Sequence, residues 1–149
     1  MRISIRSIAL AGALLFLPLS AMAQSNEHAA VDRAMQKMMR AFETEDRDLM
    51  FEVLRKDGTV LGYSPGRGSV VTETTEAWAQ GFTGKPADDE DQRHRRYEIL
   101  DVTGDAAAVK VMLDYPGWIG VDYLALSKID GQWMIVSKSW SGRAKPKAR

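Results

Sequence analysis

The side chains best suited to acid–base chemistry are two aspartates in the last third of the chain, Asp114 and Asp122. A carboxylate that works with a nearby phenol can remove a proton and stabilise the charge that develops. Three tyrosines, Tyr63, Tyr97 and Tyr115, could serve as that phenol. Asp122 is the candidate general acid or base, because the strand that carries it places it beside an apolar surface.

The two histidines are poorly placed for catalysis. His28 lies at the start of an expected helix, and His94 lies in Arg93-His94-Arg95-Arg96, directly after the acidic run 88–91. These basic side chains could form an anion site, or they could pair with the adjacent acids on a solvated edge. With no cysteine and only these two histidines, the sequence predicts no metal site, and nothing in it implies a cofactor.

The tryptophans offer large flat surfaces on which a ligand can stack. Trp118 follows a Pro-Gly turn and Trp78 lies on an expected short helix, so both are candidates for a pocket wall. Trp133 is expected to be a core anchor.

The strand pair around Asp130-Gly131 carries the main prediction of a pocket. This dipeptide favours a two-residue hairpin loop, which fixes the pairing of the strands beside it. The expected opposed pairs are Lys128 with Trp133, Leu126 with Ile135, Leu124 with Ser137, and Asp122 with Ser139. The shared face therefore runs from apolar to polar, whereas a core face would stay apolar because a dry carboxylate costs several kcal/mol. The gradient indicates the lining of an opening; alternatively, Asp122 reaches solvent at the rim or caps a helix.

The opposite face of this hairpin is too apolar for a surface bathed in water. Its residues include Tyr123, Val136, Lys138 and Trp140. We expect a homodimer joined through Tyr123, Val136 and Trp140.

Hydrophobic periodicity and turn residues predict an α+β fold. Residues 27–43 have helical spacing, a second helix capped by Asp46 or Asp48 reaches Leu54, and a third capped by Thr72 reaches Phe82. A short strand is expected at 59–63, and a meander of four strands at 93–102, 106–115, 118–129 and 132–140. The turn at 103–105 could form a loop of two residues or of three, and the sequence does not choose between them.

The amino-terminal segment is typical of a secretory signal. Basic residues precede the apolar run 8–19, and a small-x-small ending predicts cleavage after Ala23. The alternative is a membrane anchor, but the run is shorter than the ~20 residues needed to span a bilayer, and Pro18 interrupts it. We therefore expect a periplasmic or secreted protein with no membrane contact after cleavage. Its parts would be a signal peptide (1–23), one domain (24–141) and a basic, disordered tail (142–149).

The charge balance limits the partners. The chain has 20 basic and 20 acidic residues, and such a neutral balance argues against a nucleic-acid binder.

The layout and several segments resemble the nuclear transport factor 2-like superfamily, in particular its lumazine-binding and SnoaL-like branch. The segments that carry the likeness are 99–107, 110–117, 122–124 and 128–138. The resemblance implies a cone-shaped barrel, with two to three amino-terminal helices packed on a curved antiparallel sheet. It also implies a pocket between the helices and the concave sheet, and commonly a dimer. Characterised members include isomerases, dehydratases and cyclases, so the fold alone does not choose a chemistry.

The function that the sequence favours is binding of a small organic molecule without catalysis. The expected binding residues are Trp78, Tyr97, Tyr115, Trp118, Asp122, Ser137 and Ser139. One alternative is a small isomerase or dehydratase with Asp122 as its acid or base, although no motif matches the catalytic positions of ketosteroid isomerases. Another is a pocketless accessory domain that serves dimerisation.

Overall fold

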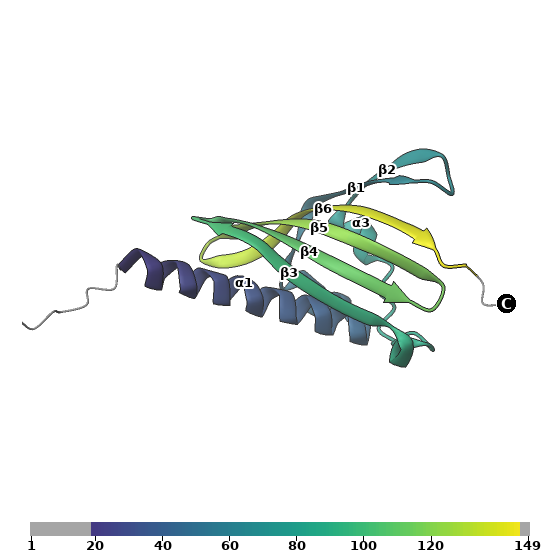
Figure 1. The fold of residues 1–149 in the computed structure, drawn as a ribbon, viewed down its shortest axis with the longest axis horizontal. Coiled ribbons are helices and arrows are strands. Elements are labelled where there is room, and N and C mark those ends of the chain that lie inside the picture. Colours follow the sequence, from purple (N-terminus) through teal and green to yellow (C-terminus); the bar gives the residue numbers. More distant parts are fainter. Residues whose placement is uncertain (1–18, 147–149) are drawn as a thin grey trace, which may run out of the picture.

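The computed structural model describes residues 19–146, in which a long helix lies along one face of a curved, six-stranded sheet (Figure 1). The helices are α1 (Leu19–Thr44), α2 (Arg47–Phe51), α3 (Thr75–Ala79) and the 3₁₀ turn η1 (Glu90–Gln92). The strands are β1 (Leu54–Ser64), β2 (Ser69–Thr74), β3 (His94–Thr103), β4 (Ala106–Tyr115), β5 (Trp118–Ile129) and β6 (Gln132–Ala144). Their order is β2-β1-β6-β5-β4-β3. This arrangement confirms the predicted α+β cone fold, except that the sheet is mixed because β1 and β6 run parallel.

The core lies between α1 and the sheet face that carries Val111, Leu124 and Ile135, which we call the inner face; the opposite side is the outer face. Helix α1 buries Met35 and Met38 completely against this face, as their helical spacing predicts. These methionines fill the core.

Two polar contacts hold the amino-terminal half of α1 on the sheet. The Glu27 carboxylate accepts hydrogen bonds from Lys128 Nζ at 2.6 Å and from Trp133 Nε1 at 2.9 Å. The helix begins at Leu19, before the predicted cleavage site at Ala23, and residues 1–18 of the expected signal lie outside the described residues.

Helix α2 is shorter than the sequence predicts. It ends at Phe51, and Leu54 already belongs to β1, where it pairs with Ile135. The Ile135 amide donates to the Val53 carbonyl at 2.7 Å, so the end of the expected helix is taken up by the sheet. Tertiary pairing thus overrides local helical preference.

The cap of α2 gives a direct test of local structure. The Asp46 carboxylate accepts a hydrogen bond from the Leu49 amide at 2.9 Å. Asp46→Ala is expected to lower the free energy of unfolding by about 1 kcal/mol in urea denaturation, because that amide loses its partner. Asp48→Ala, which removes only a first-turn charge, should cost a few tenths of a kcal/mol. A larger loss of stability in Asp48→Ala than in Asp46→Ala would contradict the assignment of Asp46 as the cap.

Residues 69–82 differ most from expectation. The sequence predicts a helix from Thr72 to Phe82, but Ser69–Thr74 forms β2 against β1, and α3 follows with Thr74 as its cap. Valine and threonine dominate 70–74, and such β-branched residues favour a strand. The partner strand β1 is correspondingly longer than the expected 59–63.

The register of the β5–β6 hairpin changes part-way along. Pairing follows the prediction from the turn as far as Leu126 opposite Ile135, and then β6 gains one unpaired residue, Val136. Beyond this bulge the opposed pairs are Ala125 with Ser137, Leu124 with Lys138, Tyr123 with Ser139, and Asp122 with Trp140. The predicted pairing of Leu124 with Ser137 and of Asp122 with Ser139 is therefore wrong. An extra residue turns every later side chain to the other face, so Lys138 and Trp140 reach the inner face.

Two boundaries are also settled by pairing. Thr103 lies opposite Ala106, so the loop between β3 and β4 has two residues, which is the shorter of the two predicted lengths. Strand β6 continues to Ala144 opposite Trp118, so the first residues of the expected disordered tail are strand instead. Those residues have a partner because β5 already begins at Trp118.

Candidate functional site

A cavity of about 370 Å³ lies over the inner face near α3 and the β1–β2 hairpin. Its lining residues are Val60, Ser64, Arg67, Val71, Glu73, Trp78, Leu113, Trp118, Asp122, Lys138 and Trp140. Three of the residues expected to bind a ligand, Trp78, Trp118 and Asp122, are among them. The four others lie elsewhere.

A buried ion pair lies at the base of this cavity. Asp122 is 1% exposed, and Lys138 Nζ donates to its Oδ2 at 2.9 Å. Burial raises the pKa of Asp122, and the Lys138 ammonium partly opposes this rise. Among the described residues, no donor is within hydrogen-bonding distance of Asp122 Oδ1. Asp122 therefore neither reaches solvent at a rim nor caps a helix; it is an inward-facing carboxylate with one acceptor left over.

Trp78 brings α3 to the ion pair. Its ring packs edge-on against Phe42 at 6.0 Å and against Phe82 at 5.3 Å between ring centroids. Lys138 Nζ lies 4.8 Å from the centre of the same ring. The ammonium is thus held between the carboxylate of Asp122 and the aromatic face of Trp78, a favourable position for a cation.

Glycines make room for the two other indoles. Gly120 lies opposite Gly142, and a Cβ on either would fall 1.9 Å from a ring atom of Trp118. A Cβ on Gly62 would fall 2.4 Å from Trp140 Nε1. The indoles therefore lie directly on backbone that has no side chains, and both keep part of their surface exposed.

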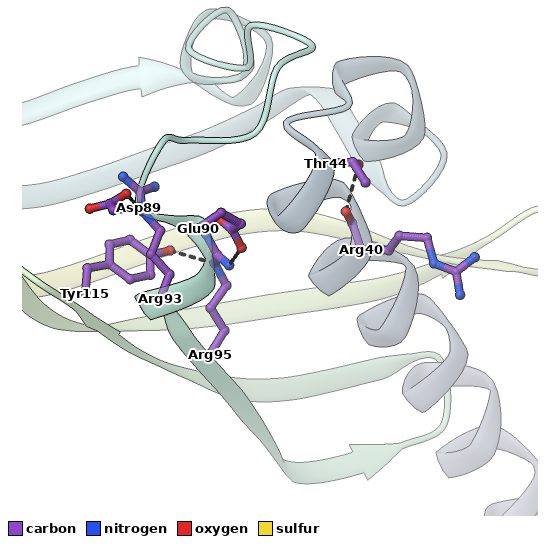
Figure 2. Close-up of polar contacts among 7 residues, drawn as sticks. All are labelled: Arg40, Thr44, Asp89, Glu90, Arg93, Arg95 and Tyr115. Atoms are coloured by element: carbon purple, nitrogen blue, oxygen red, sulfur yellow. Dashed lines mark hydrogen bonds and ion pairs between the residues drawn. The ribbon is translucent and has the colours of Figure 1, made fainter.

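Tyr115 belongs to a cluster at the end of β4 (Figure 2), which adjoins the cavity because its ring centre lies 6.1 Å from that of Trp118. Its Oη accepts a hydrogen bond from Arg95 Nε at 2.9 Å, and the Arg93 guanidinium lies 4.7 Å from its ring centre. Figure 2 shows Arg95 turned toward Glu90, whose carboxylate it binds with both terminal nitrogens. Burial raises the pKa of Tyr115, against the effect of Arg95. The hydroxyl is therefore committed to a structural contact.

The same cluster decides between the two interpretations of the basic run 93–96. Arg95 pairs with Glu90, and Arg93 pairs with Asp89 at 2.7 Å. The acidic loop thus neutralises both arginines, as the second interpretation expects. His94 and Arg96 are exposed on the other side of β3.

The remaining expected binding residues also lie outside the cavity. Tyr97 Oη donates to Asp32 Oδ1 at 2.6 Å and links β3 to α1; burial and that hydrogen bond raise the pKa of Tyr97 to about 12. Ser137 and Ser139 are on the outer face because of the bulge. Sequence reasoning missed Lys138 and Trp140 for the same reason.

The fold agrees with a sequence comparison. The model of the family described as "Putative lumazine-binding" matches residues 26–141. The chain belongs to this family. The match confirms the resemblance seen in the sequence and supports a domain that binds a small ligand.

Solved structures place this member of the lumazine-binding family among nuclear transport factor 2-like folds. A nuclear transport factor 2-like protein of unknown function from Shewanella baltica has a TM-score of 0.67 at 18% identity, covering 81% of this chain and 97% of that one. A protein from Novosphingobium aromaticivorans, described as a putative scytalone dehydratase, has a TM-score of 0.58 at 17% identity. The match covers 87% of this chain and 98% of that one. The association domain of C. elegans CaMKII has a TM-score of 0.58 at 17% identity, covering 80% of this chain and 98% of that one. None of the curated proteins matches the chain.

Two structural features are absent from the described part of this lumazine-binding family member. Within residues 19–146, no group of three or more histidine, aspartate or glutamate side chains is arranged to hold a metal ion. No helix of that same part of the chain has the length and hydropathy to cross a membrane.

Proposed function

We propose that the domain binds a flat organic molecule in the cavity above Asp122, with indole faces as its walls. The observation that carries this proposal is the meeting of three partly exposed tryptophans around a buried ion pair that has an unused acceptor. Ligand sites typically combine apolar walls with a few polar groups, and about 370 Å³ is within their usual size range. The family description, which concerns a planar bicyclic compound, favours the same class of ligand.

A binding screen tests the proposal. Bicyclic aromatic compounds, lumazine among them, are added to the purified protein and followed by thermal shift and tryptophan fluorescence. A ligand at one hundred times its Kd stabilises the folded state by about 2.7 kcal/mol, which raises Tm by several degrees. Trp140→Leu should weaken binding, whereas Tyr123→Ala on the outer face should not. A complete lack of response would favour the pocketless alternative.

A catalytic role of Asp122 is the second candidate. Burial raises its pKa, which is the direction that suits a general acid or base, and one similar fold is described as a putative scytalone dehydratase. Hydroxyketones are the substrates to assay. Asp122→Asn should abolish turnover while the circular dichroism spectrum is kept, and an unchanged rate would end this idea.

We also propose that two copies associate through the outer face. Tyr63, Tyr123 and Leu61 remain 56%, 50% and 47% exposed there, and Ser139 pairs with both Leu61 and Tyr123. Trp140 drops out of the interface expected from the sequence, because it lies on the inner face. Sedimentation should give a dimer for the wild type and a monomer for Tyr123→Lys, while Leu100→Lys on β3 serves as the control. A monomeric wild type would contradict the proposal.

Export remains a proposal from the sequence. Cleavage after Ala23 would remove residues 19–23 of α1 and keep Glu27, which binds Lys128 and Trp133. Mass spectrometry of protein from a periplasmic or culture fraction should give Gln24 as its first residue. Full-length chain confined to the cytoplasm would overturn the assignment.

A further inference from the structure

The charges that line the cavity cancel. Arg67 and Lys138 are positive, and Glu73 and Asp122 are negative. Only the pair Lys138–Asp122 is deep, with side chains 10% and 1% exposed. A ligand carboxylate would lie beside Asp122, and a ligand amine would compete with Lys138 for the same oxygens. An uncharged ligand leaves the pair intact.

The deep pair has hydrogen-bonding capacity left on both partners. Asp122 Oδ2 accepts from Lys138, but Oδ1 has no donor among the described residues. A lysine ammonium has three protons, and within residues 19–146 the contacts of Lys138 are one hydrogen bond to Asp122 and the ring of Trp78. One free acceptor and one free donor thus lie side by side. A buried acceptor without a partner costs free energy that a ligand can recover.

The walls restrict the shape of a ligand. Trp118 is fixed across Gly120 and Gly142, and Trp140 lies against Gly62. Indoles that rest on glycine backbone cannot sink further, so they keep their positions in the cavity wall. Flat rings use such surfaces best because they stack on them.

We propose that the cavity takes an uncharged flat ring whose edge carries an N–H beside a carbonyl, as in a cyclic amide. The ligand N–H donates to Asp122 Oδ1, and its carbonyl oxygen accepts from Lys138 Nζ. This inference rests on the proposed function, because it assumes that the cavity binds a small molecule.

Access to Oδ1 depends on Lys138. Asp122 Oδ1 is covered in the structure, so a ligand reaches it only when side chains around it move. Lys138 is one of these, because its Nζ donates to Oδ2 of the same carboxylate. It can turn a second N–H toward a ligand carbonyl and keep its bond to Oδ2, so the ion pair is retained. The long lysine stem allows this movement without a change in the strand.

Four quinoline derivatives test the pattern in calorimetric titrations of the full chain. Quinolin-2(1H)-one has the N–H and carbonyl edge, and its 1-methyl derivative lacks the donor. The 6-methyl derivative adds the same bulk but keeps the donor, and quinoline-2-carboxylate carries a charge. We expect the parent and the 6-methyl compound to bind about tenfold or more tightly than the other two, because a hydrogen bond to a charged group is lost in those.

A double variant separates recognition from simple stacking. Asp122→Leu with Lys138→Met replaces the pair by apolar groups of similar size and should bring the parent and 1-methyl compounds within twofold of each other. Ser137→Ala on the outer face should keep the full preference. Equal binding of these two compounds to the wild type would overturn the inference and leave the proposed function standing. Tightest binding of the carboxylate would also overturn it, and failure of every flat compound to bind would overturn both proposals.

Discussion

Lys138→Met is expected to lower the free energy of unfolding by about 3–5 kcal/mol, because it leaves the Asp122 carboxylate buried without a counter-charge. Asp122 is 1% exposed, so little water reaches its carboxylate in the folded protein. Methionine keeps the length of the side chain, so little packing is lost. The measured effect therefore reports the missing charge.

Urea denaturation and thermal melting measure this loss against two controls. Lys37→Met makes the same substitution in a surface pair, where Lys37 and Glu52 are 41% and 55% exposed, and should cost less than about 1 kcal/mol. The double variant Asp122→Leu with Lys138→Met should recover most of the stability, since a buried pair is often replaceable by apolar groups. A loss below about 1 kcal/mol in Lys138→Met alone would contradict the burial of the pair.

The same variant has a defined pH dependence. Burial raises the pKa of Asp122 in the folded state, and without Lys138 nothing opposes that rise. A carboxyl with a raised folded pKa binds its proton more tightly when folded, so stability falls as pH rises from the unfolded value toward the folded one. The gap between Lys138→Met and the wild type should therefore narrow as the solution is acidified. A constant gap across that range would contradict a role for the Asp122 charge.

Elements governed by local chemistry could be predicted from the sequence. The Asp130-Gly131 turn fixed the pairing of its neighbours, and helical spacing located Met35 and Met38 in the core. The cap at Asp46 was one of two local alternatives. In each case the deciding interactions lie within a few residues of one another, so a sequence pattern is enough.

The cavity depends on relations between distant segments, which no local pattern reveals. The bulge at Val136 occurs where β6 also begins to follow β1, and it alone brings Lys138 beside Asp122. The sequence predicted an apolar-to-polar gradient on this face with Asp122 at its polar end, but it placed Ser137 and Ser139 there in place of Lys138 and Trp140. Trp118 and Trp140 were visible as large flat side chains, yet their positions depend on glycines in neighbouring strands.

Those glycines lead to the second large effect, in Gly120→Ala. Alanine suits a strand interior better than glycine by roughly 0.5–1 kcal/mol, so composition alone predicts a gain. A Cβ at this position would instead lie 1.9 Å from Trp118 Cη2 and 2.5 Å from Cζ2 and Cζ3. We expect a net loss of about 2–3 kcal/mol, with a changed tryptophan emission spectrum, because the ring must leave its place on the backbone.

A double-mutant cycle shows whether the ring is the cause. A Trp118→Ala background removes the three atoms nearest to the new methyl, so Gly120→Ala should be close to neutral there, which gives a coupling energy of about 2 kcal/mol or more. Gly66→Ala is the matched control, since nothing lies within 4 Å of its Cβ position. Wild-type stability and emission in Gly120→Ala would contradict the placement of the Trp118 ring on the Gly120 backbone. If the coupling is found, the absence of a side chain at Gly120 is what positions Trp118 beside the cavity.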